Sequence, residues 1–166
     1  MAYGQRGHLA VSFQDSFGVS NVASHHFVPI VAESLQEEIG QIVEDTMYAR
    51  LAESPVHQGL HRVSGEISTE AHPVQLGVLL KAALGLSSVT AQGSAFLHEF
   101  LPATQDWDDR AALPPFTAEV HRDVGSAFIY YDLLGTSLVL EIAHGQLLAC
   151  TLGVQGGRFM RSAAAT

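Results

Sequence analysis

Polar and apolar positions alternate along residues 61–70. This alternation is typical of a β-strand that turns one face to the core and the other to solvent. Val63 and Ile67 belong to the apolar side, and five polar residues share the opposite side. These polar positions are Arg62, Ser64, Glu66, Ser68 and Glu70.

A helical segment follows this strand. Residues 73–84 contain only two polar side chains, Gln75 and Lys81. Proline suits the first position of a helix, where no backbone N–H is needed, and Gly85 suits the position after the last turn. The pattern predicts a helix over residues 73–84 that is buried on most sides and packs on a sheet. We therefore expect Leu80→Asp to prevent folding by burying an unpaired charge.

The remaining segments predict short strands joined by turns. Pro29 cannot donate a hydrogen bond to a neighbouring strand, so the strand around it is expected at a sheet edge. The later segments are separated by Val124-Gly125, Gly135-Thr136 and His144-Gly145, which predict hairpin turns. The predicted strands cover residues 27–33, 34–44, 94–100, 116–123, 126–134, 137–143 and 146–154. Together with one helix, they indicate a mainly antiparallel β domain.

The domain boundaries follow from the segments that lack such patterns. Glycine and serine interrupt the apolar groups of residues 1–26, which predicts an N-terminal arm before a domain over residues 27–155. Residues 45–60 show no sustained period and predict a long loop, of a length that is usually functional. Residues 156–166 are expected to form a C-terminal tail.

The composition favours a protein that assembles. The 166 residues fit one domain, and 47% are apolar while only 15% are charged. The formal net charge is -9, from 17 acidic and 8 basic residues, so no basic surface is available to grip nucleic acid. A single cysteine excludes an intramolecular disulfide. No apolar stretch approaches the roughly 20 residues that span a bilayer.

Catalytic and metal-binding patterns are not evident. His57 and His61 are four residues apart but flank Gly59, where a shared helical face is not expected. Cys150 lies within an apolar strand and is expected to act as a small hydrophobic side chain. We predict neither an enzyme nor a bound cofactor or metal.

The order of the segments resembles the tail tube proteins (major tail proteins) of long-tailed bacteriophages over residues 27–155. The Gly65-Glu66-Ile67 strand leads through Glu70-Ala71-His72-Pro73 into a helix that ends at Gly85. The segments His98-Glu99-Phe100 and Phe116-Thr117-Ala118-Glu119-Val120 and a turn at Gly145 follow in the same order.

This resemblance implies an antiparallel β-sandwich or barrel with one flanking α-helix. It further implies a structural virion protein, assembled in the bacterial host cytoplasm, in which six copies form a ring and rings stack into a tube for DNA passage. The implied partners are other copies of the chain, a tape-measure protein, a tail terminator and a sheath, with DNA only as transient cargo and no membrane. A net-acidic wall suits such a conduit because it repels DNA.

Within this resemblance, we expect Arg62, Ser64, Glu66, Ser68 and Glu70 to face the lumen, although the same residues on the outside of the tube fit the pattern equally. Glu119, His121 and Asp123 share one face of a later strand and are candidates to join them. The loop over residues 45–60 is expected to reach a neighbouring subunit or ring, so deleting residues 45–58 should leave a folded domain that stacks poorly. Two alternatives stay open: a neck, terminator or adaptor ring of the virion, and a β-barrel small-molecule binding protein or enzyme that uses His57 or His61.

Overall fold

The described part of the chain is built almost entirely of β-strands. The computed structural model describes the chain except for residues 1–6, 23–24, 45–54, 104–112, 124 and 162–166. One helix, α1 (Pro73–Leu84), lies among eleven strands. The strands are β1 (His8–Phe13), β2 (His26–Val28), β3 (Ala32–Glu33), β4 (Gln36–Val43), β5 (Val56–Glu70), β6 (Gly85–Gln92), β7 (Ala95–Pro102), β8 (Phe116–His121), β9 (Phe128–Glu141), β10 (Ala149–Gly156) and β11 (Arg158–Arg161).

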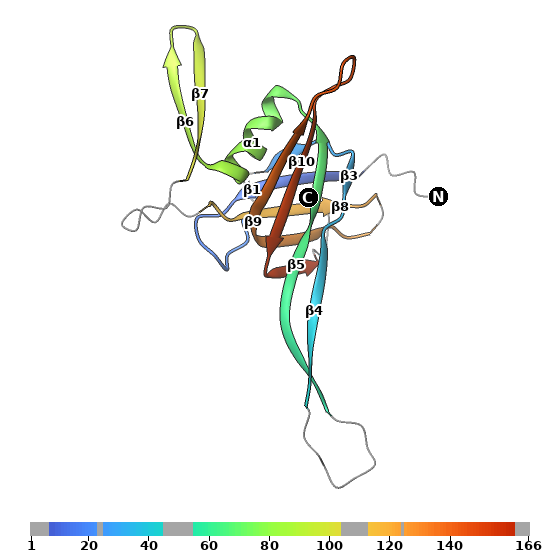
Figure 1. Cartoon of the computed structure of the whole chain (residues 1–166). Helices are drawn as coiled ribbons and strands as arrows, with labels where there is room; N and C mark the ends of the chain where they lie inside the picture. Colours follow the sequence, from blue (N-terminus) through green and yellow to red (C-terminus); the bar gives the residue numbers. More distant parts are fainter. Residues whose placement is uncertain (1–6, 23–24, 45–54, 104–112, 124, 162–166) are drawn as a thin grey trace.

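Nine strands form one antiparallel sheet in the order β2-β1-β8-β9-β10-β5-β3, with β4 also paired to β5 and β11 also paired to β9. Strands β6 and β7 form a separate hairpin. Figure 1 shows this hairpin and the turn between β9 and β10 projecting from one end of the molecule, while β4 and β5 extend from the other end. We call β4 with residues 56–62 of β5 the β4–β5 extension.

Strand β9 connects the two halves of the sheet. Its first residues pair with β8 and β11, whereas residues 134–141 pair with β10. Asp132 lies between these parts with a positive φ of 59°. Its carboxylate accepts hydrogen bonds from the backbone N–H of Gly18 at 2.7 Å and from Nε2 of Gln14 at 3.1 Å. These bonds stabilise the bend at which the strand passes from one half to the other.

The core lies between the two halves of the sheet and one side of α1. Residues from the two halves of the sheet and from the helix form one apolar cluster, so these elements share a single core. Its fully buried members include Leu9, Val11, Val63, Ile67, Leu79, Phe116, Val120, Leu133 and Leu152.

The predicted class, mainly antiparallel β with one flanking helix, is confirmed, and the helix has the predicted bounds. The predicted burial of that helix is wrong in extent: only Leu79 and Ala82 are buried, and Val74 is 81% exposed. Leu80 is half-buried. Leu79 and Ala82 are therefore the helix positions at which a charge would be fully buried.

Several strands differ from the predictions. Strand β1 lies inside the predicted N-terminal arm. Its short apolar run forms a strand because one edge pairs with β2 and the other with β8. Strand β11 lies inside the predicted tail, and β6 was not predicted. Strand β5 begins at Val56, inside the predicted loop over residues 45–60, of which residues 45–54 lie outside the described residues.

The predicted turn at Gly135 is absent because β9 continues through it as one strand. A Cβ atom at Gly135 would lie 2.6 Å from the backbone oxygen of Ala82 in α1. The glycine at this position is thus explained by the close approach of the helix to the strand.

Candidate assembly surfaces

The alternating strand predicted from the sequence has one accessible polar face. In β5, Val63, Ile67 and Thr69 are buried. The five predicted residues lie on the opposite side: Arg62, Glu66 and Glu70 are exposed, and Ser64 and Ser68 are half-buried.

Neighbouring strands extend this polar face. Residues paired directly across antiparallel strands point to the same side. Glu38 of β4 pairs with Arg62, and Ala149 of β10 pairs with both Glu70 and Glu141 of β9. The result is a surface with four exposed glutamates and one exposed arginine, which we call the acidic face. Its charged members are Glu38, Arg62, Glu66, Glu70 and Glu141.

The residues of the later strand do not join the acidic face. Glu119 of β8 is only 2% exposed, and its Oε2 atom lies 3.8 Å from Nε2 of His25. His121 stacks on His8 with ring centroids 5.3 Å apart, and Asp123 follows the strand with φ at 68°. Strand β8 is central, between β1 and β9, and nearly all of its residues are buried, so alternation along its sequence did not reveal an exposed face.

The half of the sheet formed by β9, β10, β5, β3 and β4 has two edges that are unpaired within the described residues. On one side, β3 and β4 pair with β5 and with no further strand. On the other side, residues 135–141 of β9 pair only with β10, since β8 ends its pairing at Leu133. Val139 and Leu140 on this second edge are 47% and 46% exposed. Exposed edges of this kind are templates for pairing with another chain.

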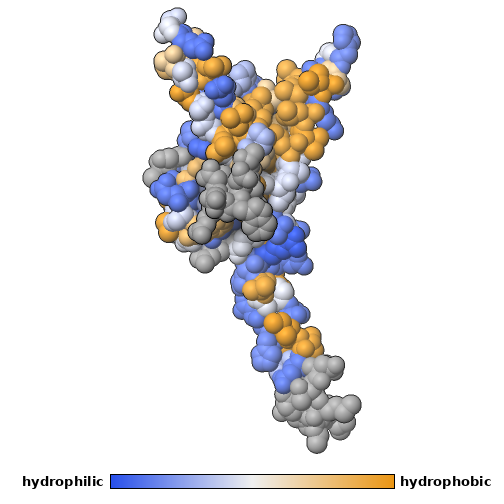
Figure 2. Space-filling model, turned by 60° about the vertical axis from the view of Figure 1, so that its left-hand side comes forward, coloured by the Kyte–Doolittle hydropathy of each residue, from blue (hydrophilic) through white to orange (hydrophobic). Residues whose placement is uncertain are grey.

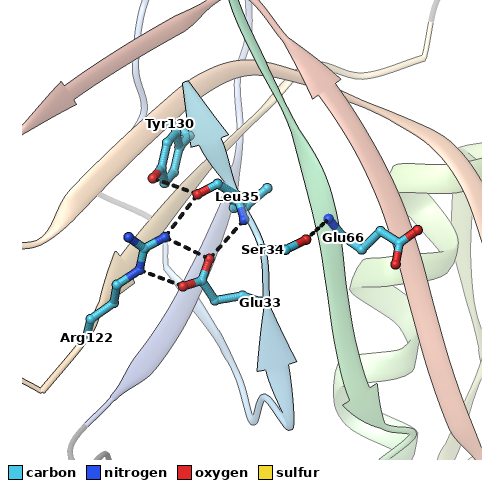
Figure 3. Close-up of polar contacts among 6 residues, drawn as sticks. All are labelled: Glu33, Ser34, Leu35, Glu66, Arg122 and Tyr130. Atoms are coloured by element: carbon cyan, nitrogen blue, oxygen red, sulfur yellow. Dashed lines mark hydrogen bonds and ion pairs between the residues drawn. The ribbon is translucent and has the colours of Figure 1, made fainter. Parts of the chain in front are cut away.

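A polar cluster holds the base of the β4–β5 extension to the sheet (Figure 3). The Arg122 guanidinium donates to Glu33 at 2.6 and 3.1 Å and to the backbone oxygen of Leu35 at 2.9 Å. The Tyr130 hydroxyl donates to the same Leu35 oxygen at 3.0 Å. Leu35 itself is 1% exposed. The turn between β3 and β4 is therefore held against β8 and β9 by both packing and charge.

The same turn also crosses over β5. The Ser34 hydroxyl accepts a hydrogen bond from the backbone N–H of Glu66 at 2.9 Å, and the Ser34 N–H donates to the Glu66 oxygen at 3.0 Å. A Cβ atom at Gly65 would lie 2.6 Å from the Ser34 oxygen. Only glycine leaves room for this crossing.

Within the described ranges, three groups have shifted pKa values with clear causes. Hydrogen bonding to Glu33 raises the pKa of Arg122. Burial raises the pKa of Tyr130, and the neighbouring Arg122 offsets part of that shift. Burial also raises the pKa of the Cys150 thiol, which opposes the thiolate form needed for nucleophilic chemistry.

The histidines considered for metal binding pair with carboxylates instead. His61 Nδ1 lies 2.6 Å from Oε1 of Glu37, and His57 Nε2 lies 3.7 Å from Oε2 of Glu44. Both pairs link β4 to β5 along the extension. No group of three or more metal-ligating side chains is found among the described residues. In the same part of the chain, no helix has the length and apolar character to cross a membrane.

The β4–β5 extension also carries an unusual amount of exposed apolar surface. Figure 2 shows apolar side chains along the extension and on the projections at the other end. Exposed apolar side chains gathered on a projecting element are candidates for an interaction site. On the extension, the exposed side chains are Ile39 (46%), Ile42 (59%), Val43 (62%), Val56 (56%) and Leu60 (89%).

A second apolar surface lies between α1 and β7. A groove with a volume of about 520 Å³ separates the first turns of the helix from the strand. The Phe100 ring forms one wall, and its Cζ atom lies 3.2 Å from where a Cβ of Gly77 would be. The lining residues are Pro73, Val74, Leu76, Gly77, Leu80, His98 and Phe100. We call this the α1–β7 groove.

Comparison with known proteins identifies the family. The sequence matches the model for phage tail tube proteins over residues 4–166. The chain therefore belongs to the phage tail tube protein family and is a structural component of the phage tail. No relative was found among curated protein sequences.

One solved structure shares the fold of this chain, and two others are less similar. A chain in the virion of a native gene transfer agent particle is 10% identical, with a TM-score of 0.55 over 93% of this chain and 95% of the other. A chain in the tube-terminating cap of the anti-feeding prophage is 9% identical, with a TM-score of 0.47 over 94% and 88%. A chain in the PVC sheath–tube complex of an extracellular contractile injection system is 10% identical, with a TM-score of 0.46 over 94% and 88%. At 10% identity, the first similarity is one of fold alone.

Proposed function

We propose that the chain forms six-membered rings that stack into the tube of a phage tail, through which DNA passes. The observation that carries this proposal is a pair of unpaired edges on opposite sides of the part of the sheet formed by β9, β10, β5 and β4. One is the edge of β9 and the other is the edge of β4. An edge of β9 in one subunit can pair with the edge of β4 in the next. Closing the ring then removes the exposed edges of β9 and β4 from solvent in every subunit.

The acidic face forms the wall of the lumen in this arrangement. Its opposite side is the core, with Ile67 and Leu152 fully buried, so only the acidic face of these strands is free to line a channel. Four glutamates against one arginine repel the DNA phosphates, and the DNA slides without binding. The predicted lumen residues Arg62, Ser64, Glu66, Ser68 and Glu70 all belong to this face.

The remaining parts of the proposal follow from the family. Subunits assemble in the cytoplasm of the bacterial host and become part of the virion. A tape-measure protein, a tail terminator and, in contractile tails, a sheath are the expected partners. Catalysis and a cofactor have no part in this function.

Electron microscopy of the purified protein over a concentration series tests the proposal. We expect rings with a central hole that stack into tubes. Single rings that never stack would favour a neck, terminator or adaptor protein. Small particles without a hole would refute the ring and favour the binding module that uses His57 or His61.

Gold labelling tests the lumen assignment separately. Glu66→Cys offers an exposed thiol, whereas the native Cys150 is buried. A maleimide-linked gold cluster should appear inside the hole of Glu66→Cys rings. The matched control is Ser88→Cys on the exposed β6–β7 hairpin, which should place the label elsewhere. Gold on the outer surface of Glu66→Cys rings would refute the assignment.

A further inference from the structure

We propose that the α1–β7 groove is the docking site for the β4–β5 extension of a second copy of the chain in the adjacent ring. This inference rests on the proposed ring and names the two surfaces that join one ring to the next. It begins from the direction of the strands. In a sheet closed into a ring, hydrogen bonds run around the circumference and the strands run toward the neighbouring rings.

Strand β5 places the two surfaces at opposite ends of the molecule. It has 15 residues and, at about 3.3 Å per residue, spans about 50 Å. Its first residues belong to the extension, and only two residues separate its end from α1. Figure 1 shows the extension at one end and α1 with the β6–β7 hairpin at the other. Copies stacked head to tail therefore bring the extension of one copy to the groove of the next, a contact that repeats without closing.

The position of the proposed lumen determines which face of the extension contacts the groove. α1 packs through Leu79 into the core, so it lies on the side of the sheet opposite the acidic face. An extension that leaves the channel clear passes outside the wall of the next ring. It then presents to that ring the face that it shares with Arg62. Leu60 is on this face, two residues from Arg62 in the same strand.

The side chains on this face match the groove in chemistry. Leu60 is 89% exposed. Ile42 is 59% exposed and lies four residues from Glu38 in β4, on the same face as the Glu38–Arg62 pair. The groove is lined mainly by apolar side chains, and Val74 at its rim is 81% exposed. A groove of about 520 Å³ has room for both an Ile and a Leu side chain. Docking removes these exposed apolar groups from water on both partners.

Charge substitutions test the docking site without disturbing the fold, since Leu60 and Val74 are almost fully exposed. Leu60→Asp and Val74→Asp should each leave rings intact and reduce the mass of tubes by about tenfold or more, because each buries an unpaired charge. Combining Leu60→Asp with Val74→Lys should restore tubes. The matched control, Val43→Asp, places the same charge on the other face of the extension and should leave tube formation within about twofold of wild type.

Disulfide trapping gives a second readout. In the double variant Leu60→Cys with Val74→Cys, mild oxidation of tubes should produce a ladder of covalent multimers, which oxidation of dispersed rings should not. If the wild type forms tubes and Val74→Asp forms them equally well, the docking site is refuted while the ring proposal stands. The same conclusion follows if the wild type forms tubes and the double variant gives no ladder. Wild-type protein that forms no rings at all would instead refute the proposed function.

Discussion

Replacing Arg122 with alanine tests the polar cluster that holds the β4–β5 extension to the sheet. Arg122 donates two hydrogen bonds to Glu33 and one to the oxygen of the buried Leu35. Its guanidinium also lies 4.8 Å from the centre of the Phe128 ring. The substitution removes all of these contacts but leaves the Tyr130 hydroxyl on the Leu35 oxygen.

The expected cost follows from these contacts and their exposure. A hydrogen bond to a charged group contributes about 1.5–3 kcal/mol, and a cation–π contact at an exposed site about 0.5–1 kcal/mol. The Arg122 side chain is 43% exposed while that of Glu33 is 11% exposed, so water replaces only part of what is lost. We expect Arg122→Ala to lower the free energy of unfolding by about 3 kcal/mol.

A double-mutant cycle with Glu33→Ala isolates the pair. Urea unfolding followed by circular dichroism, at a concentration below that of assembly, should give a coupling energy of about 2 kcal/mol. Arg62→Ala is the matched control, because this exposed arginine lies outside the cluster and its loss should cost less than about 0.5 kcal/mol. A coupling energy below about 0.5 kcal/mol would refute the reasoning.

Three further predictions concern single positions. Leu79→Ala should lower the free energy of unfolding by about 2–5 kcal/mol in the same urea assay, and the half-buried Leu80→Ala should cost clearly less; equal losses would contradict the observed burial. Gly65→Ala should destabilise the protein by more than about 1 kcal/mol because its Cβ would meet the Ser34 oxygen at 2.6 Å, whereas Gly157→Ala, with nothing within 4 Å and no positive φ, serves as the control for glycine replacement in urea unfolding. Burial raises the pKa of Tyr130 above its ordinary value of 10.0, so folding favours the neutral phenol. The stability that the neutral phenol contributes is fully present below pH 10 and is lost as the pH rises from 10 to the higher pKa of the folded state. Tyr130→Phe should therefore flatten the fall in urea midpoint above pH 10, and an unchanged slope would contradict this assignment.

The local patterns of the sequence were sufficient where one face of an element is in water. The residues between Arg62 and Glu70 alternate because one side packs on the core and the other is accessible, so this part of β5 and its polar side follow from the sequence. That these polar residues face a lumen stays a prediction. Proline at the start and glycine at the end set the bounds of α1 for reasons that act within a few residues.

The same patterns were insufficient where burial depends on distant segments. Strand β8 is covered on both sides, so Glu119 is buried beside His25 although its spacing suggested an exposed face. Gly135 was read as a turn because a sequence does not show that the Ala82 backbone approaches it. The exposure of Val74 depends on which parts of the sheet α1 contacts.

The sequence by itself determined the class of the fold, the helix, the alternating strand and a composition suited to assembly, because these depend on the spacing and type of neighbouring residues. Tertiary structure decided which sheet edges are left unpaired, that Arg122 holds the turn at Leu35, and that a groove and an extension lie at opposite ends of β5. These features arise from residues far apart in the chain, whose contacts exist only once the strands have paired.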